Sequence, residues 1–353
     1  MQQSKNLSQS EQSYSHIKEY SDIQLQKIKD SKKNIKDADK KRVGYYCWAG
    51  PDMIKMTNLK FFNPKINEQS LLQSYDYDYL KQVKEKLGVT DVWATYTWGF
   101  DEKSEKQQYN FLNSKLDNFK KLGLKVHAYI QGPNVVYDDY KNHNWYSKDE
   151  YNRLVPYYRG RKVTCLNNPQ FVDYISNKIL KTYNKGFDGI FVDNIHMGQI
   201  PFPDLDNKGL FTFAGCNCDI CNAKYHKIYG AKIPKKFDKN NYNEYQDFRI
   251  KSTNDFVKIL SDITRKGKME FGSNSYDPKY DTKKIFGTDL EQLQKLQDYI
   301  LFENHSLPGK NKNNKYINDL IIKDDIKKPV FVVTYDKGIG YDKQYTQDQI
   351  DNI

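Results

Sequence analysis

Four of the five cysteines in the chain are spaced as ligands of a metal ion. Cys216, Cys218 and Cys221 form a C-x-C-x2-C run, and Cys165 lies upstream. Three thiols within six positions suit a disulfide network poorly, because a disulfide restricts how its two residues approach each other. One tetrahedral zinc ion accepts four such sulfurs. The spacing predicts a closed structural zinc site, with His226 as the reserve fourth ligand and a disulfide between two of the cysteines as the alternative.

Two apolar runs end in a carboxylate. Residues 186–194 read Gly-Phe-Asp-Gly-Ile-Phe-Val-Asp-Asn and close on Asp193 and Asn194, and residues 299–302 lead directly into Glu303. A carboxylate at the end of a buried strand is unfavourable unless it is paired, hydrogen-bonded or functional. Glycoside hydrolysis needs two carboxyl groups across the scissile bond. A loop-capping role for Asp193 and an ion pair of Glu303 with Lys or Arg are the structural alternatives.

The elements that position these residues alternate along the chain. Short apolar, β-rich runs are separated by amphipathic stretches, several of which end in a glycine typical of a helix C-cap, such as Gly88, Gly123 and Gly186. Nearly continuous apolar strands between helices predict a parallel sheet covered on both faces. The expected strands are 43–47, 91–95, 125–130, 189–192, 269–272, 299–302 and 330–333, and the expected helices include 79–87, 111–122, 171–183, 248–265 and 290–296.

Seven such units favour an α/β fold of the (β/α)8 TIM-barrel type. An open dinucleotide-binding sheet is disfavoured, because no glycine-rich phosphate loop follows the first strand. No eighth strand is evident after residue 333, so we expect a truncated chain in which the barrel lacks its last strand, with a naturally shorter, incomplete barrel as the alternative. Residues 1–40 are polar and are expected to form a disordered or helical leader, and residues 41–353 are assigned to the barrel.

Parallel barrel strands bring their carboxyl ends to one mouth, where the chemistry of such folds takes place. Tryptophans at this mouth would form platforms for sugar rings. The equal alternative is that they are ordinary residues of the hydrophobic core. His127, inside the third strand, is expected to be a core histidine rather than a catalytic base. His196 and His305 lie on loops, where either can be an ordinary polar residue. The predicted substrate-binding residues are Trp48, Asp52, Trp98, Gln131, Asn194, Asn274, His305 and Tyr335.

The run 186–194 resembles the fourth strand of glycoside hydrolase-like barrel families, among them the family 114 endo-polygalactosaminidases. Cys165, followed by an Asn-Asn-Pro run and then by C-x-C-x2-C, resembles the zinc cluster of family 42 beta-galactosidases. Family 42 ends its fourth strand in Asn-Glu and places its nucleophile on the seventh. Here the fourth strand ends Asp193-Asn194, and the seventh is followed by Thr-Tyr-Asp without a glutamate, so beta-galactosidase activity does not follow.

A carboxylate on strand four with another on strand six instead resembles barrel alpha-glycosidases. That resemblance implies Asp193 as nucleophile and Glu303 as acid/base of a glycosidase acting on an oligo- or polysaccharide. A carbohydrate-binding barrel without catalysis is the competing class, because fold alone does not fix function.

The composition narrows the partners and the compartment. Of the net charge of +11, the first 42 residues supply +4, since they hold ten basic and six acidic side chains. The remaining basic residues are interspersed with acidic ones and form no basic helix face, so specific nucleic-acid binding is not expected.

No run of residues is apolar enough for a membrane span. The start of the chain lacks the apolar core of a signal peptide, so a cytoplasmic location is expected, or secretion if the biological start differs. The oligomeric state is left open.

Overall fold

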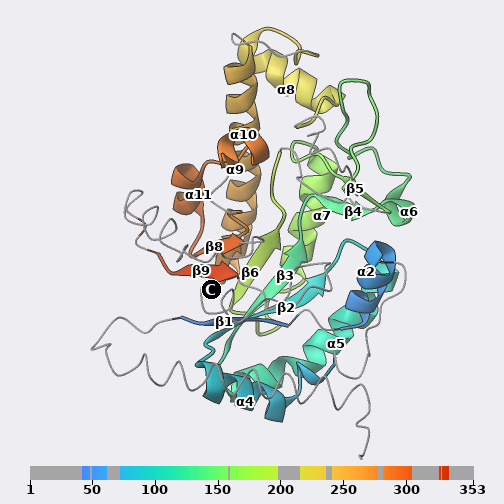
Figure 1. Ribbon diagram of the computed structural model, residues 1–353. Helices are drawn as coiled ribbons and strands as arrows, with labels where there is room; N and C mark the ends of the chain where they lie inside the picture. The colour runs from blue at the N-terminus through green and yellow to red at the C-terminus, as the bar shows by residue number, and fades with distance from the viewer. Residues whose placement is uncertain are drawn as a thin grey trace, which may run out of the picture.

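The computed structural model describes residues 42–47, 50–61, 72–157, 160–197, 215–235, 241–276, 281–303, 326 and 328–333 (Figure 1). The expected leader at 1–40 lies outside these residues, as do Trp48, His305 and Tyr335. Glu303 is described as part of a strand, but its side chain is outside the description.

The described strands that carry the fold are parallel and follow the chain order. One sheet has the order β1 (Gly44–Cys47), β2 (Asp91–Thr97), β3 (Lys125–Gln131), β6 (Gly189–Asp193) and β7 (Glu270–Ser273). A second parallel pair, β8 (Ile300–Glu303) and β9 (Val330–Val333), meets β7 through a bridge between Asn274 and Leu301. All seven predicted strands are therefore confirmed, and so is the α/β class.

The sheet curves so that its first and last described strands approach each other. The ring of Trp93 on β2 lies 4.8 Å from that of Phe331 on β9, and the Arg42 guanidinium, just before β1, lies 5.3 Å from the centre of the same Phe331 ring. These contacts form part of an aromatic interior. Among the described residues no hydrogen-bonded pairing joins β9 to β1, so the structure establishes a curved parallel sheet, and the closed barrel stays a prediction.

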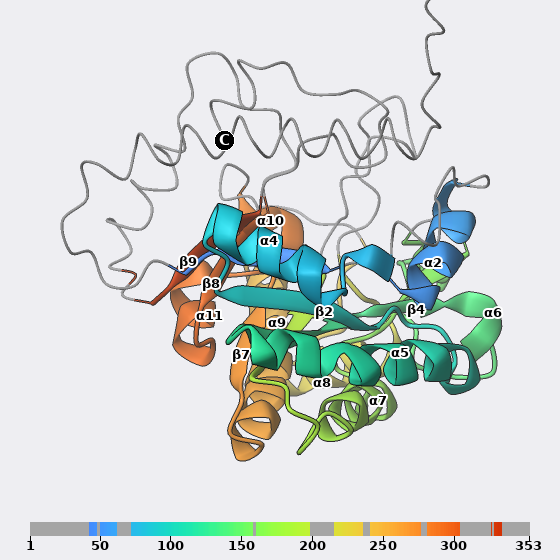
Figure 2. The same ribbon diagram turned by 90° about the horizontal axis from the view of Figure 1, so that it is seen from below.

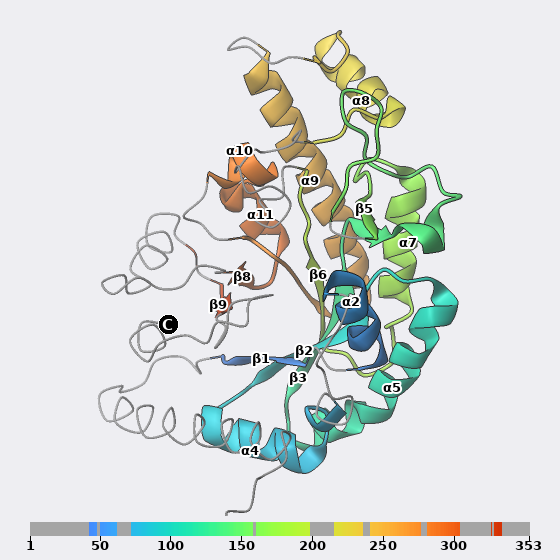
Figure 3. The same cartoon turned by 45° about the vertical axis from the view of Figure 1, so that its right-hand side comes forward.

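Helices cover the outer face of the curved sheet. Figures 2 and 3 show α4 (Tyr77–Leu87), α5 (Glu102–Lys121), α7 (Pro169–Leu180) and α9 (Tyr242–Lys266) around the outside of the strands. The five predicted amphipathic stretches are confirmed as these helices and α11 (Leu290–Leu296). Elements that were not predicted are α2 (Pro51–Phe61), α6 (Tyr137–Tyr140), α8 (Asp219–Tyr229), α10 (Thr282–Phe286) and the antiparallel pair β4 (Asn134–Val136) and β5 (Arg161–Val163).

Local capping explains where two of the long helices begin. Asp101 caps α5 by accepting a hydrogen bond from the backbone N–H of Ser104, which places the helix start nine residues before the predicted one. Asn168 caps α7 in the same way, and Pro169 occupies the first turn, where its missing N–H is not needed. None of the described helices is long and apolar enough to cross a membrane.

Candidate active site

Asp193 is the last residue of β6, and its carboxylate is held by donors from three elements. The Tyr129 hydroxyl of β3 donates to Oδ2, and the Asn274 amide, just after β7, donates to Oδ1 at 3.1 Å. Asn194 donates twice, from its backbone N–H to Oδ1 at 2.7 Å and from its side-chain amide to Oδ2 at 2.8 Å. Asp193 remains 8 % exposed. We call Asp193, Tyr129, Asn194 and Asn274 the Asp193 cluster.

The backbone around β6 explains why Asn194 can bond its own neighbour. Asn194 has φ 56°, in the left-handed region that asparagine tolerates better than most residues. The Tyr157 hydroxyl donates to its side-chain oxygen at 2.6 Å and so fixes the amide with its N–H toward Asp193. A Cβ at Gly132 would lie 1.8 Å from the Asp193 carbonyl oxygen, so only glycine lets the end of β3 pack this closely.

Tyr129 acts in the cluster as a hydrogen-bond donor that keeps its proton. Burial raises the pKa of its phenol well above the usual value, and the negative charge of Asp193 raises it further. Its ring lies 5.2 Å from that of Trp98. The sequence indicated Tyr129 only as a strand residue. Alternation along a strand puts it on the same face as Gln131, two residues later, and that was the signal available.

The other predicted site residues divide into four groups. Gln131 is buried and pairs in register with Asp193 across β3 and β6, and Trp98 is 4 % exposed against Tyr129, so both lie beside the Asp193 cluster. Asp52 lies apart in the first turn of α2, where its contacts are with Lys55 and Gln108. Glu303 ends β8 at the same edge as Asp193, with its backbone opposite Val333. Trp48, His305, Tyr335 and the Glu303 side chain fall outside the described residues.

The four cysteines predicted as metal ligands come together. All four are buried, and their Sγ atoms lie within 4.8 Å of one another. Cys165 precedes α7 and lies 3.4 Å from Cys221 and 3.6 Å from Cys218, sulfur to sulfur. Hydrogen bonding with the other three cysteines lowers the pKa of Cys218. All five cysteines of the chain are described and none forms a disulfide, so this cysteine cluster could hold one metal ion and join the starts of α7 and α8.

A second group of potential ligands lies at the opposite edge of the sheet. One ligand atom each of Asp91, His127 and Glu270 lies within 4.8 Å of the other two. However, Arg42 donates hydrogen bonds to both carboxylates, and His127 Nε2 lies 2.9 Å from an Asp91 oxygen. Burial alone would raise the pKa of Asp91, yet hydrogen bonds with His127, Arg42 and Thr90 outweigh it and hold the pKa well below its usual range. Arg42 and Lys125 pair with the two carboxylates of this group, and His127 is confirmed as a buried core residue.

No protein-family model and no curated protein sequence matches the chain. Solved structures do. A beta-galactosidase from the psychrophilic Marinomonas ef1 aligns with a TM-score of 0.50 and 14 % identity over 79 % of this chain. A polyextremophilic beta-galactosidase from the Antarctic haloarchaeon Halorubrum lacusprofundi aligns with a TM-score of 0.50 and 11 % identity over 74 %. The alignments span 43 % and 39 % of those two chains. At this identity the likeness shows the fold alone, which is a glycoside hydrolase-like α/β fold with a parallel sheet.

Proposed function

We propose that the chain is a glycoside hydrolase that cleaves an oligo- or polysaccharide, with Asp193 as nucleophile and Glu303 as acid/base. The observation that carries the proposal is the set of hydrogen bonds to the Asp193 carboxylate at the carboxyl edge of the sheet. Donors around a carboxylate favour its ionised form and fix its direction. A nucleophile needs both, because attack requires a free charge and an aligned lone pair.

The proposed chemistry requires a second carboxyl group that carries a proton. Glu303 closes β8, which the Asn274–Leu301 bridge joins to β7, and β7 in turn pairs with the strand of Asp193. In the first step Glu303 would protonate the leaving oxygen while Asp193 attacks the anomeric carbon, and in the second Glu303 would deprotonate the water that releases the sugar. This retaining course needs about 5–5.5 Å between the two carboxyl groups, and a gap of about 6.5–9.5 Å gives inversion instead.

The test is release of reducing ends from a panel of polysaccharides. Asp193→Asn and Glu303→Gln should each remove most turnover while leaving folding and sugar binding largely intact. Asp188→Asn is the matched control, because Asp188 lies just before β6, at the amino edge of the sheet and away from Asp193. Its carboxylate accepts hydrogen bonds from Lys120 and from the Val126 N–H. Near-normal turnover in either site variant would remove that residue from the mechanism. Glycan binding without cleavage across the panel would make the chain a carbohydrate-binding barrel.

We also propose that the cysteine cluster binds a structural zinc ion. Tetrahedral Zn–S bonds of about 2.3 Å set the sulfurs about 3.8 Å apart, and the separations of 3.4 and 3.6 Å around Cys165 are close to this. Four thiolates around Zn²⁺ leave a net negative charge that N–H donors stabilise. The Asn167 amide donates to the Cys221 sulfur at 3.3 Å, and Lys224 bonds the oxygen of the same amide at 2.7 Å.

Four sulfur ligands fill a tetrahedral site, so the ion would stabilise the junction of α7 and α8 and take no part in turnover. Metal analysis of protein purified without added zinc should give about one zinc per chain. Zinc-free protein with all five thiols reduced and a normal thermal transition would overturn this assignment.

A further inference from the structure

A buried carboxyl group on α5 holds the loop that follows β2. Glu105 is fully buried, and its Oε1 accepts three backbone N–H groups in succession, from Trp98 at 2.8 Å, Gly99 at 2.7 Å and Phe100 at 3.0 Å. The N-terminus of α5 does not need this group as a cap, because Asp101 already accepts the Ser104 N–H. The three bonds therefore serve the loop at 98–100 and not the helix.

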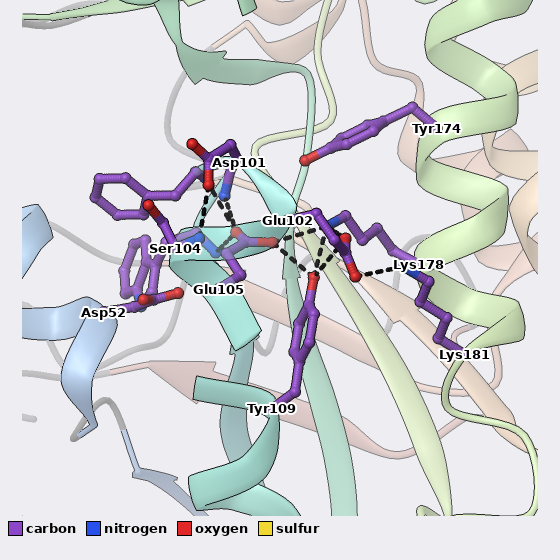
Figure 4. A network of polar contacts seen from close by, with 12 residues as sticks. Asp52, Asp101, Glu102, Ser104, Glu105, Tyr109, Tyr174, Lys178 and Lys181 are labelled. Carbon is purple, nitrogen blue, oxygen red and sulfur yellow. Dashed lines mark hydrogen bonds and ion pairs between the residues drawn. The ribbon is translucent and has the colours of Figure 1, made fainter. Parts of the chain in front are cut away.

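The other oxygen of Glu105 has a separate set of partners. Oε2 accepts the Tyr109 hydroxyl at 2.7 Å and the Lys178 ammonium at 2.8 Å, and Figure 4 shows the three side chains converging between α5 and α7. Lys178 is itself 2 % exposed and also bonds Glu102 at 2.9 Å. One oxygen thus anchors the loop, and the other is balanced by a buried cation. A buried carboxylate without such a partner would be strongly destabilising.

Two successive contacts connect the loop that Glu105 anchors to the Asp193 carboxylate. The Trp98 ring lies 5.2 Å from the Tyr129 ring, and the Tyr129 hydroxyl donates to Asp193. The loop is also confined on its far side. Gly99 has φ 74°, and a Cβ there would lie 2.7 Å from the Arg161 guanidinium. A shift of the 98–100 backbone would therefore move Trp98 against Tyr129.

We propose that Glu105 is a positioning residue of the Asp193 site. Through its three N–H bonds it sets the place of Trp98, and through Trp98 that of the Tyr129 hydroxyl on the Asp193 carboxylate. Lys178 is the counter-charge that allows Glu105 to do this inside the protein. The effect on turnover rests on the proposed glycosidase function, whereas the effect on Trp98 does not.

Two double variants separate loop anchoring from charge pairing. Glu105→Gln keeps an acceptor oxygen for the loop but points an amide N–H₂ at the Lys178 ammonium, so donors oppose each other. Combining Glu105→Gln with Lys178→Met removes that conflict and keeps the loop acceptor. Combining Glu105→Leu with Lys178→Met removes the conflict and the acceptor together. Lys181→Met is the control, because Lys181, at the end of α7, is half-exposed and pairs with Glu102 of α5, which also pairs with Lys178.

The readouts are turnover, thermal unfolding and the near-ultraviolet circular dichroism of Trp98, obtained as the difference from Trp98→Phe in each background. The Glu105→Leu/Lys178→Met protein should lose about 100-fold in kcat/KM, the scale expected for a misplacement of about 1 Å, and should lose the Trp98 signal. The Glu105→Gln/Lys178→Met protein should recover most of both, and Lys181→Met should match the wild type.

Equal turnover and equal Trp98 signals in the two double variants would overturn the proposal, because Glu105 would then be only a partner for Lys178. If the wild type cleaves no glycoside, the Trp98 signal alone decides. Its loss in the leucine variant and recovery in the glutamine variant would support the anchoring role, while the glycosidase function would fail separately.

Discussion

Replacing Asp52 by asparagine should change how the stability of the protein depends on pH. Asp52 is fully buried in α2, and burial raises the pKa of its carboxyl group from 3.8 to about 7, with a further contribution from the negative charge of Glu105. Lys55, 3.3 Å away, acts in the opposite direction and only partly offsets the rise. The folded state therefore binds a proton at Asp52 more tightly than the unfolded chain does.

The sign of the effect follows from that difference in affinity. Between about pH 4 and pH 7 the folded protein keeps the proton and the unfolded chain has lost it, so the free energy of unfolding falls as the pH rises. Each pH unit in this window is worth about 1.4 kcal/mol, so the change from 3.8 to about 7 amounts to about 4 kcal/mol. Above pH 7 Asp52 ionises inside the protein, and the loss is complete. Asp52→Asn has no proton to lose.

The assay is chemical unfolding of both proteins at pH 4 and pH 8. Other groups titrate in both, so they cancel in the difference. The stability of the Asp52→Asn variant relative to the wild type should rise by about 4 kcal/mol between the two pH values. Asp117→Asn, which removes an exposed aspartate from α5, controls for the loss of a carboxyl group as such. A difference between variant and wild type that stays within about 1 kcal/mol at both pH values would refute the reasoning.

Other perturbations test separate parts of the molecule. Tyr129→Phe removes a hydroxyl donor to Asp193 and should lower kcat/KM by about 10- to 100-fold, because a hydrogen bond to a charged group is worth about 1.5–3 kcal/mol. Unaltered kinetics would contradict a role for this bond. Asp91→Asn should lower the free energy of unfolding by about 3–5 kcal/mol in denaturant titrations near neutral pH, because it leaves Arg42 with one buried partner fewer. The deficit should shrink as the pH falls through the unfolded pKa toward the low folded one, and a deficit independent of pH would count against the network. Cys221→Ser should lower zinc retention against a competing chelator, and equal retention would exclude Cys221 as a ligand.

The strands were predictable because buried parallel strands are apolar almost throughout. Each of the seven runs is short, β-rich and bounded by polar residues, which are local properties of the sequence. The pair β4 and β5 was missed because each strand has only three residues, too few to show any periodicity. The first half of α5 was missed because its polar stretch shows no apolar face, and a single cap at Asp101 sets where it begins.

The meeting of Asp193 and Asn274 in the candidate site was predictable, because both lie at strand ends. Asp193 and Asn274 follow apolar runs, and parallel strands bring such ends to one edge. Glu105 gave no comparable signal, because a glutamate in an amphipathic helix is normally exposed. Its burial is tolerated because it pairs with Lys178, 73 residues later in the chain. Only the packing of α5 against α7 brings these two residues together.

The buried carboxylates at the two edges of the sheet have different kinds of hydrogen-bond partner. Asp91, at the amino edge, shares its charge with Arg42 and bonds His127, an arrangement that favours the folded state. The hydrogen bonds to Asp193 from Tyr129 and the two asparagines come from neutral groups, which orient the carboxylate and leave its charge unpaired by a cation in these bonds, as the proposed role of nucleophile requires. Substitutions at the amino edge should therefore act first on stability, and substitutions at the carboxyl edge first on turnover. That division, if measured, would support the proposal that the carboxyl edge is the site of chemistry.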